Sequence, residues 1–384
     1  MFNETDHRWM ARALELAALG LYTTTPNPRV GCVIVREGEL VAEGWHRRAG
    51  EAHAEIVAIG QAGGRTRGAD VYLSLEPCSH FGRTPPCVDA LIEAQVGRVI
   101  VAMEDPNPQV EGRGLARLRA SGIDVRCGLM REEALELNRG FWSRMTRARP
   151  WVRLKVAASL DGATALENGQ SQWITGAAAR ADGHAWRARA CAILTGIGTV
   201  RADDPRLDVR LVETARQPLR VLVDSRLAID LDARLVRGAN LLIATAAQGL
   251  EEKERDLRDR GCEIVRLPDP EGRVDLRALM GELARRSLNE IHVEGGFGLN
   301  GALLRAGCVD ELLVYLAPSL LGSGRGMFEL GPFKGLDERV ALRIVAAAPV
   351  GTDLRIVARV ANEGAEDDGA ARAPQPPRGP VPAS

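Results

Sequence analysis

The chain has 384 residues, enough for two or three domains, and a hydrophobic content of 45% allows each of them a buried core. The net charge of −1 gives no support to nucleic-acid binding, which normally needs a basic surface. The seven cysteines are odd in number and scattered, the first residues lack the pattern of a secretory signal, and no apolar run is long enough to cross a membrane. We therefore expect a cytoplasmic protein that interacts with neither nucleic acid nor membrane.

The first 147 residues alternate between helical and strand patterns. Asp6 is the expected cap of a first helix that stops at Gly20, and a proline-rich loop then leads into an expected strand hairpin over residues 30–45. Further helices are expected at 53–61, 86–94, 115–120 and 131–145, and further strands at 71–75, 99–102 and 123–126. This alternation favours an open α/β sandwich.

The basic run before Pro150 interrupts the pattern and is the best domain boundary in the chain. A second α/β pattern follows. Its expected strands are 151–158, 192–195, 219–223, 241–244, 263–267, 290–293, 311–317, 343–345 and 354–360, and its expected helices are 177–190, 249–260, 273–286 and 302–306. From residue 362 the composition shifts to small, charged and proline residues, which predicts a disordered tail over 362–384.

His53-Ala54-Glu55 is followed by Pro77-Cys78, with Cys87 nine residues further on. One imidazole, two thiols and a carboxylate that is not needed as a ligand are the parts of a catalytic zinc site. Three protein ligands leave the fourth position to water, whose pKa bound zinc lowers to about 7. Glu55 is then expected to shuttle the proton, and His53 and Cys78 are expected at helix starts, where a thiolate is electrostatically favoured.

Other interpretations of these residues remain open. A lone His-x-Glu is common, and two cysteines are often small buried apolar side chains. A closed structural zinc site would need a fourth ligand, for which His46 and His80 are the available imidazoles. The order of the motif, the proline before Cys78 and the free glutamate favour the catalytic zinc.

This arrangement resembles the signature of the zinc-dependent cytidine and nucleobase deaminases. The usual spacer of two residues between the cysteines is replaced by residues 79–86, and this longer insert resembles the bifunctional deaminase-reductase family of riboflavin biosynthesis. The residues at 26–31, 44–46 and 49–53 agree with that resemblance.

A second motif, the glycine-rich run 296–301, follows the strand expected at 290–293. Its backbone N–H groups are suited to a dinucleotide phosphate, because glycines let the chain approach closely. The nearest acids, Asp310 and Glu311, come too soon for a Rossmann fold, so a tight turn without a ligand is the alternative.

The segments 159–162, 171–175, 195–207 and 223–225 resemble the reductase domain of the same family. The resemblance implies a cytidine-deaminase-like α/β/α sandwich over residues 1–147 and a dihydrofolate-reductase-like, NADPH-dependent α/β domain over residues 150–361, with the chain forming a homo-oligomer through the reductase domain. Cofactor contacts are implied at Ala157, Trp173, Thr199, Asp203, Ser225, Gly296, Phe297, Gly298, Leu299, Asn300, Gly301 and Ala302. Substrate contacts are implied at Ser171, Arg187, Leu207, Arg210 and Glu294.

Elementary chemistry supports part of this set. A phosphorylated ribose suits arginine forks, although a single arginine is more often a solvent-facing charge. Trp173 could equally be a core anchor. In the first site, Asn27 and His46 are hypothesised substrate contacts.

The resemblance implies a two-site enzyme. The first site removes the 2-amino group of a diaminopyrimidinone ribotide with zinc, and the second reduces the ribose of the deaminated product to a ribityl chain with NADPH. The proton donor of the second site stays open among Asp203, Lys155 and Asp161. The alternatives are a nucleic-acid deaminase with a binding module, a zinc-stabilised scaffold without activity, and a Rossmann dehydrogenase fused to an inactive deaminase.

Overall fold

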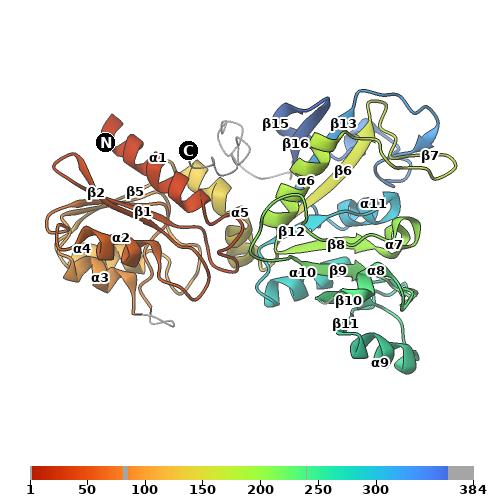
Figure 1. Cartoon of the computed structure of the whole chain (residues 1–384), viewed down its shortest axis with the longest axis horizontal. Helices are drawn as coiled ribbons and strands as arrows, with labels where there is room; N and C mark the ends of the chain where they lie inside the picture. The colour runs from red at the N-terminus through yellow and green to blue at the C-terminus, as the bar shows by residue number, and fades with distance from the viewer. Residues whose placement is uncertain (1, 81–84, 239, 362–384) are drawn as a thin grey trace.

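The computed structural model describes residues 2–80, 85–238 and 240–361 and shows two α/β halves joined by helix α5 (Arg131–Arg147) (Figure 1). We call residues 2–147 the N-terminal half and residues 150–361 the C-terminal half. The tail expected over residues 362–384 lies outside the described residues.

The N-terminal half contains a five-stranded sheet in the order β2-β1-β3-β4-β5. Strands β1 and β2 form the expected hairpin, β1 and β3 are also antiparallel, and β3, β4 and β5 are parallel. The strands are β1 (Gly31–Arg36), β2 (Glu39–Trp45), β3 (Asp70–Leu73), β4 (Arg98–Val101) and β5 (Asp124–Cys127).

Helices cover both faces of this sheet, as the alternating pattern predicted. One face packs on α1 (Glu4–Ala18) and α5, and the other on α2 (Ala54–Ala62), α3 (Cys87–Glu93) and α4 (Arg113–Ala120) (Figure 1). Each face has its own buried apolar cluster, so the sandwich is confirmed.

The expected cap of the first helix is wrong by three residues. The N-cap is Asn3, whose side chain accepts a hydrogen bond from Asp6 N at 2.8 Å, while Asp6 accepts one from Asn3 N at 3.0 Å. Asp6 is buried and also accepts a hydrogen bond from Tyr72 Oη at 2.9 Å. Both residues have the short polar side chains that caps favour, so local sequence alone could not separate them.

The C-terminal half contains a nine-stranded sheet in the order β11-β10-β9-β8-β12-β6-β13-β16-β15. The strands from β11 to β13 run parallel, and β16 and β15 add an antiparallel edge. The strands are β6 (Trp151–Ser159), β8 (Ala192–Gly196), β9 (Leu219–Val223), β10 (Leu241–Thr245), β11 (Cys262–Arg266), β12 (Glu290–Val293), β13 (Glu311–Ala317), β15 (Leu342–Val350) and β16 (Asp353–Val360). A short pair, β7 (Ala165–Leu166) and β14 (Gly324–Arg325), lies apart from this sheet.

Helices again cover both faces of the larger sheet. The helices α10 (Leu276–Arg285) and α11 (Phe297–Arg305) pack on one face. The opposite face carries α6 (Ala177–Arg189), α7 (Ile197–Asp203), α8 (Arg234–Arg237) and α9 (Glu251–Asp259). The short helices α7 and α8 were not expected, because four to seven residues show too little periodicity to reveal a helix.

The glycine-rich run differs from its expectation. Residues 297–301 form the first turns of α11, which begins at Phe297 and not at residue 302. A Cβ atom at Gly301 would collide with the backbone of Glu329, so this glycine permits a close approach between helix and loop. A glycine-rich run that allows a helix to pack closely therefore has the same composition as a glycine-rich loop.

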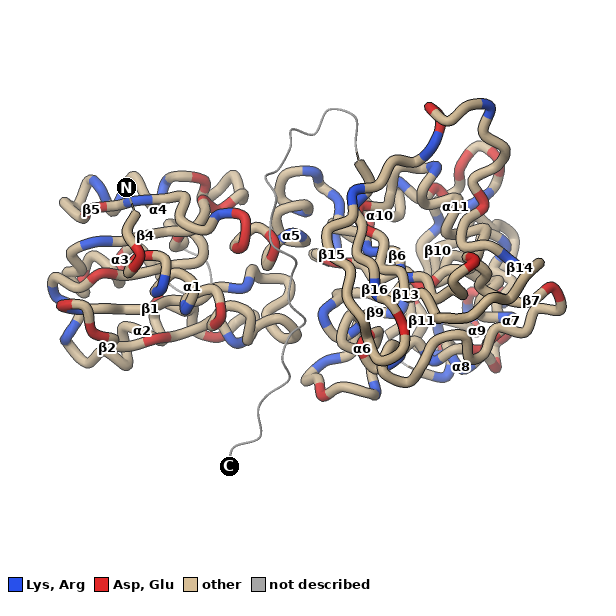
Figure 2. Tube along the Cα trace, turned by 90° about the horizontal axis from the view of Figure 1, so that it is seen from above, with Lys and Arg blue, Asp and Glu red and all other residues tan. Residues whose placement is uncertain are grey.

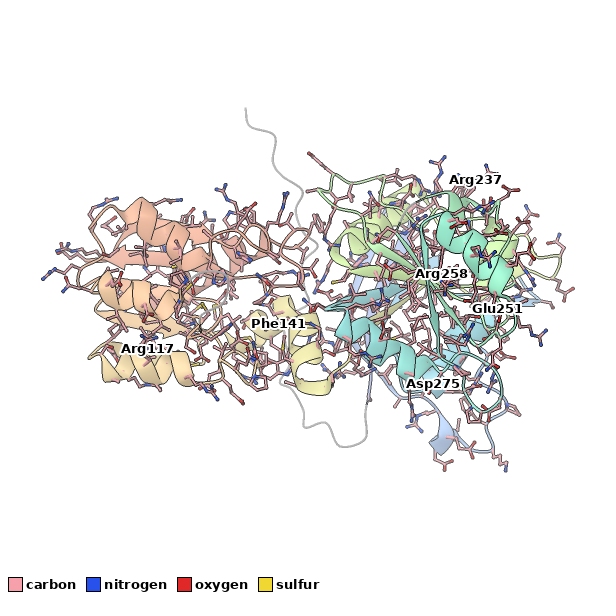
Figure 3. The ribbon with its side chains drawn as sticks, turned by 90° about the horizontal axis from the view of Figure 1, so that it is seen from below. Arg117, Phe141, Arg237, Glu251, Arg258 and Asp275 are labelled. Atoms are coloured by element: carbon pink, nitrogen blue, oxygen red, sulfur yellow. The ribbon has the colours of Figure 1, made fainter. Side chains whose placement is uncertain are left out.

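Buried ion pairs join the two halves. Arg29 of the N-terminal half contacts the Glu290 carboxylate at 2.8 Å, and Arg189 and Arg153 of the C-terminal half contact the same group at 2.7 and 3.4 Å. Phe141 on α5 also lies between the halves (Figure 3). Burial alone would raise the pKa of Glu290, but the charges of Arg189, Arg29 and Arg153 outweigh it and hold that pKa well below its ordinary value.

Changing Glu290 to Gln leaves three buried guanidinium groups without their shared anion, and we expect a loss of about 3–5 kcal/mol in the free energy of unfolding. The loss should shrink as the pH falls below about 4.3, because the unfolded glutamate takes up a proton there while the folded carboxylate stays charged. Urea titrations at several pH values measure both effects.

The matched control is Glu43→Gln, which removes the carboxylate of a surface ion pair with Arg12 at 2.7 Å. Both side chains of that pair are partly exposed, so its loss should cost about 0–1 kcal/mol. Equal losses for the two variants would contradict a structural role for Glu290.

Candidate active sites

Three expected metal ligands meet in the N-terminal half. His53 is the N-cap of α2, Cys87 is the first residue of α3, and Cys78 lies in the loop after β3. His53 Nδ1 lies 3.3 Å from Cys87 Sγ and 3.6 Å from Cys78 Sγ. The expectation that Cys78 begins a helix is wrong, since the insert places Cys87 there instead.

The geometry of these atoms fits a zinc ion. Zinc bonds of about 2.0–2.3 Å at tetrahedral angles separate nitrogen and sulfur ligands by about 3.6 Å. Within residues 2–80, 85–238 and 240–361, the group that could hold a metal consists of these three residues alone. His46, one alternative fourth ligand, instead pairs with Asn27 Nδ2 at 3.0 Å and with the Ala52 carbonyl at 3.1 Å. A group of one histidine and two cysteines has the composition of ligands that leave a fourth position open, as catalytic zinc sites do.

Electrostatic interactions within the group of His53, Cys78 and Cys87 favour the binding of a cation. The Cys87 side chain hydrogen-bonds to Cys78 and, with a further hydrogen bond from His53, lowers the pKa of Cys78 to about 4. The backbone N–H of Cys87 also donates to Cys78 Sγ at 3.3 Å. Cys78 therefore reaches the thiolate form, which is the form that binds metal.

Glu55 is buried in the first turn of α2, two residues after His53. Burial raises the pKa of its carboxyl group, which neighbours both His53 and Cys87 without joining the ligand group. A carboxyl group in this position can exchange protons with a molecule bound beside the ligands.

Asn27 and His46 lie beside the same group. The rings of His46 and His53 meet edge to face with centroids 5.2 Å apart, and His46 in turn contacts Asn27. The proline-rich loop between α1 and β1 thus brings an amide to the metal ligands, which is compatible with the hypothesised substrate contacts.

A second candidate site is a cavity of about 750 Å³ in the C-terminal half, on the face of the sheet covered by α6 and α7. It brings together most residues that the resemblance implied. The lining includes the expected cofactor residues Ala157, Trp173, Thr199, Asp203, Gly296, Phe297 and Asn300 and the expected substrate residues Ser171, Arg187, Leu207, Arg210 and Glu294.

Five expected cofactor residues do not line the cavity. Ser225 Oγ accepts a hydrogen bond from Val274 N at 3.0 Å, and Leu299 packs into the hydrophobic core. The others, Gly298, Gly301 and Ala302, lie on α11 outside the lining. A helix exposes only some of its residues to a cavity, so a contiguous run could not contribute as a whole.

Two arginines that line the cavity are paired with acidic or carbonyl groups. Arg187 donates two hydrogen bonds to the Glu294 carboxylate, the Nη2 bond at 2.7 Å, and a third to the Asp208 carbonyl at 2.9 Å. Arg210 contacts Asp208 at 2.6 Å. These contacts fix both guanidinium groups at the cavity wall.

Trp173 is not a core anchor. Its side chain is 68% exposed and stacks against Arg180, whose guanidinium carbon lies 4.6 Å from the ring centre. An exposed aromatic ring at a cavity rim is available to a ligand.

The sequence did not indicate His184, which also lines the cavity. Its Nδ1 accepts a hydrogen bond from Arg210 N at 3.2 Å. Burial, reinforced by the positive charges of Arg187 and Arg210, lowers the pKa of His184 to about 4, so the ring is neutral at pH 7. Its position one helical turn before Arg187 was the available signal.

Known proteins match both halves. Residues 3–103 match the cytidine and deoxycytidylate deaminase zinc-binding region, and residues 150–356 match the RibD C-terminal domain. The riboflavin biosynthesis protein RibD of Escherichia coli is 47% identical over 364 residues, which span 91% of this chain and 98% of that protein. The chain belongs to the RibD family. It is therefore a bifunctional enzyme of riboflavin biosynthesis, a zinc-dependent deaminase and an NADPH-dependent reductase.

Other members of the family agree. The RibD of Aquifex aeolicus is 39% identical over 93% of this chain and 99% of that protein. A structure of Acinetobacter baumannii RibD superimposes with a TM-score of 0.86 at 40% identity, covering 93% of this chain and 99% of that one. The crystal structure of a Thermotoga maritima diaminohydroxyphosphoribosylaminopyrimidine deaminase/5-amino-6-(5-phosphoribosylamino)uracil reductase gives 0.83 at 32% identity, with coverage of 93% and 99%.

These matches decide between the alternatives. A reductase occupies the second half, so neither a nucleic-acid-binding module nor a Rossmann dehydrogenase is present there, and a scaffold without activity is also wrong. Basic and acidic residues are interspersed along both halves (Figure 2). In the described part of the chain, no helix has the length and apolar character needed to cross a membrane.

Changing Cys78 to Ser should abolish stoichiometric zinc binding, because a serine hydroxyl stays protonated where the cysteine supplies a thiolate. Elemental analysis of purified protein measures the zinc content, and cobalt substitution reports the sulfur ligands by absorbance. The control is Cys127→Ser at the end of β5, a half-buried cysteine outside the ligand group, which should keep its zinc. Full zinc content in the Cys78 variant would exclude Cys78 as a ligand.

Proposed function

We propose that His53, Cys78 and Cys87 hold the zinc ion of the deaminase and that Glu55 moves the protons. When bound, zinc supplies a water molecule of lowered pKa. Glu55 protonates the ring nitrogen of the pyrimidine and then the departing amino group, which leaves as ammonia. The observation that carries this assignment is the three-ligand group beside a buried carboxyl group.

The proposed substrate of this site is 2,5-diamino-6-ribosylamino-4(3H)-pyrimidinone 5′-phosphate, in keeping with the name of the Thermotoga maritima relative. Asn27 and His46 are proposed to hold its ring. The amide of Asn27 can both donate and accept hydrogen bonds, as a pyrimidine edge requires.

Changing Glu55 to Gln should reduce ammonia release by about 10²–10⁴-fold while zinc stays bound, because the amide keeps its place but acts as neither an acid nor a base near pH 7. Reduction of the deaminated intermediate should be unaffected. Ammonia and NADPH are followed separately, and zinc is measured in the same sample.

Glu51→Gln is the matched control, since this exposed glutamate lies four residues earlier and outside the ligand group. It should keep both activities. Loss of reduction together with deamination in the Glu55 variant would argue against two separate sites.

For the reductase, we propose that the cavity beneath α6 and α7 binds NADPH and 5-amino-6-(5-phosphoribosylamino)uracil together. NADPH supplies the hydride. Ala157, Trp173, Thr199, Asp203 and the N-terminal end of α11 are proposed cofactor contacts. Gly296 caps that helix without a side-chain hydrogen bond, so backbone N–H groups are available to a phosphate.

The substrate is proposed to occupy the other end of the cavity. Arg187 and Arg210 suit its phosphate, Glu294 suits ribose hydroxyls, and Ser171 and Leu207 complete the wall. The domain boundary is proposed between α5 and β6, which leaves residues 1–147 to deamination and 150–361 to reduction.

We also propose that the chain works in the cytoplasm. All seven cysteines are free, including the two proposed metal ligands, and thiolate ligands persist best in a reducing compartment.

A homo-oligomer is proposed to form through the reductase domain. Strand β15 is the edge of the nine-stranded sheet, and its outer face is apolar and exposed at Leu342 and Ile344, with Ile344 64% accessible. Leu354 of the neighbouring β16, opposite Pro349 at the other end of this strand pair, is also exposed. Unpaired strand edges with exposed apolar side chains are suited to pairing with a second copy.

Changing Ile344 to Lys should shift the chain toward the monomer, since a buried charge would oppose that contact. Sedimentation velocity over a range of concentrations measures the shift. Leu19→Lys, which alters an exposed leucine of the N-terminal half, is the control and should leave the assembly unchanged. A wild-type chain that sediments as a monomer would contradict the proposal.

A further inference from the structure

His184 is a buried histidine in the wall of the reductase cavity. It lies on α6, its side chain is only 5% exposed, and it lines the cavity together with Arg187, one helical turn further along. Buried polar atoms are normally hydrogen-bonded. The neighbours of the two ring nitrogens therefore indicate what this histidine can bind.

The first ring nitrogen has its partner in the protein. Nδ1 of His184 lies 3.2 Å from the backbone N–H of Arg210, and that group can only donate. Nδ1 therefore accepts this hydrogen bond and carries no proton. In a neutral ring the proton is then on Nε2, which becomes a hydrogen-bond donor.

The surroundings keep the ring neutral at pH 7. Burial and the positive charges of Arg187 and Arg210 lower the pKa of His184 to about 4, although the charges of Glu294 and Asp208 oppose this shift. A charged imidazolium would also need an acceptor at Nδ1, where the backbone N–H of Arg210 lies. Geometry and charge thus agree on a neutral ring with its proton on Nε2.

The second ring nitrogen faces another donor. Nε2 of His184 lies 3.4 Å from Nη1 of Arg187, and two N–H groups cannot bond to each other. Arg187 uses Nε and Nη2 for the Glu294 carboxylate and one proton of Nη1 for the Asp208 carbonyl at 2.9 Å. Among the described residues, no oxygen atom accepts a hydrogen bond from Nε2 of His184. Two adjacent donors are thus left without a shared acceptor.

The missing acceptor is best supplied by a phosphate group in the cavity, which His184 and Arg187 both line. A phosphate oxygen accepts several hydrogen bonds and carries negative charge, whereas a ribose hydroxyl also has a proton to place. The Glu294 carboxylate occupies the Nε and Nη2 edge of the Arg187 guanidinium and would repel a phosphate there. The phosphate is therefore expected beside Nη1, where His184 lies.

We propose that His184 is a phosphate-binding residue of the reductase, whose Nε2–H donates a hydrogen bond to the substrate phosphate that Arg187 Nη1 also binds. This rests on the proposed binding of 5-amino-6-(5-phosphoribosylamino)uracil in the cavity. Because Nδ1 of the same ring binds the backbone of Arg210, His184 also links the segment that carries Arg210 to helix α6. A neutral ring adds a donor without adding charge.

Two amide substitutions separate the two ring nitrogens. In His184→Asn, the side-chain oxygen can replace Nδ1 as the acceptor for the backbone N–H of Arg210, but no group reaches the place of Nε2. In His184→Gln, the longer amide reaches that place and restores a donor there. With the deaminated intermediate as substrate, the Asn variant should raise KM by about 10–100-fold with little change in kcat. The Gln variant should stay close to the wild type.

Two further ligands test the phosphate itself. Inorganic phosphate should inhibit the wild type in competition with the deaminated intermediate, and its inhibition constant should rise in the Asn variant by the same factor as KM. The dephosphorylated riboside, measured as a competitive inhibitor, should bind the wild type and the Asn variant equally. An equal loss of affinity for this riboside would contradict a contact with phosphate.

Ring ¹⁵N chemical shifts of the wild-type chain measure the tautomer without a substitution. Nε2 of His184 should be protonated and Nδ1 unprotonated from pH 6 to pH 8, and added inorganic phosphate should shift the Nε2 resonance. The signal of His184 is assigned by its absence in the Gln variant.

The matched control is His7→Asn, which alters an exposed histidine of the N-terminal half and should leave the reductase kinetics unchanged. NADPH affinity, followed by its fluorescence, and zinc-dependent ammonia release should not change in either His184 variant.

Three results would overturn the role of His184: an unchanged KM in the Asn variant, a Gln variant as impaired as the Asn variant, or a ring that is charged or protonated on Nδ1 at pH 7. If the Asn variant does not fold, the ring resonances of the wild type still decide. Failure of the wild-type enzyme to oxidise NADPH with the deaminated intermediate would instead contradict the proposed function of the cavity.

Discussion

The buried carboxylate of Glu290, surrounded by Arg29, Arg153 and Arg189, is the interaction on which the arrangement of the two halves depends. Buried charged side chains are stable only when they are paired. The cluster therefore determines which surfaces of the two halves can pack against each other. Its position at the start of β12 also matters. The same strand ends next to Glu294 in the reductase cavity, and the loop that carries Arg29 also carries Asn27 beside the metal ligands.

Parallel strands explain where the reductase cavity forms. Strands β6, β8 and β12 run in the same direction, so their carboxyl ends meet at one edge of the sheet. The residues that follow β8 and β12 supply Thr199 and Glu294, and β6 supplies Ala157 and Lys155 from its own length. The chemistry of the site therefore follows from the topology, while the covering helix α6 adds the arginine that holds Glu294.

The sequence predicted most strands and long helices because their apolar periodicity is strong; β9 and β13 have the expected bounds. It predicted His53, Cys78 and Cys87 as ligands because the order of the motif residues is kept although the spacer between the two cysteines is longer. The side chains of the three residues lie together in the structure. It could not predict which residues of the run 296–302 face the cavity, because that depends on the rotation of α11. His184 was missed because its spacing from Arg187 does not show by itself which face of α6 lines the cavity.

The loop from Thr24 to Arg29 touches both halves at once. The carbonyl of Pro26 accepts a hydrogen bond from Asn289 at 3.0 Å, and Thr25 contacts Cys191 at 2.9 Å. If either half were produced alone, the residues of this contact would be exposed to water. Their polar groups would then need other hydrogen-bonding partners. In the fused chain these groups find their partners across the seam between the two halves.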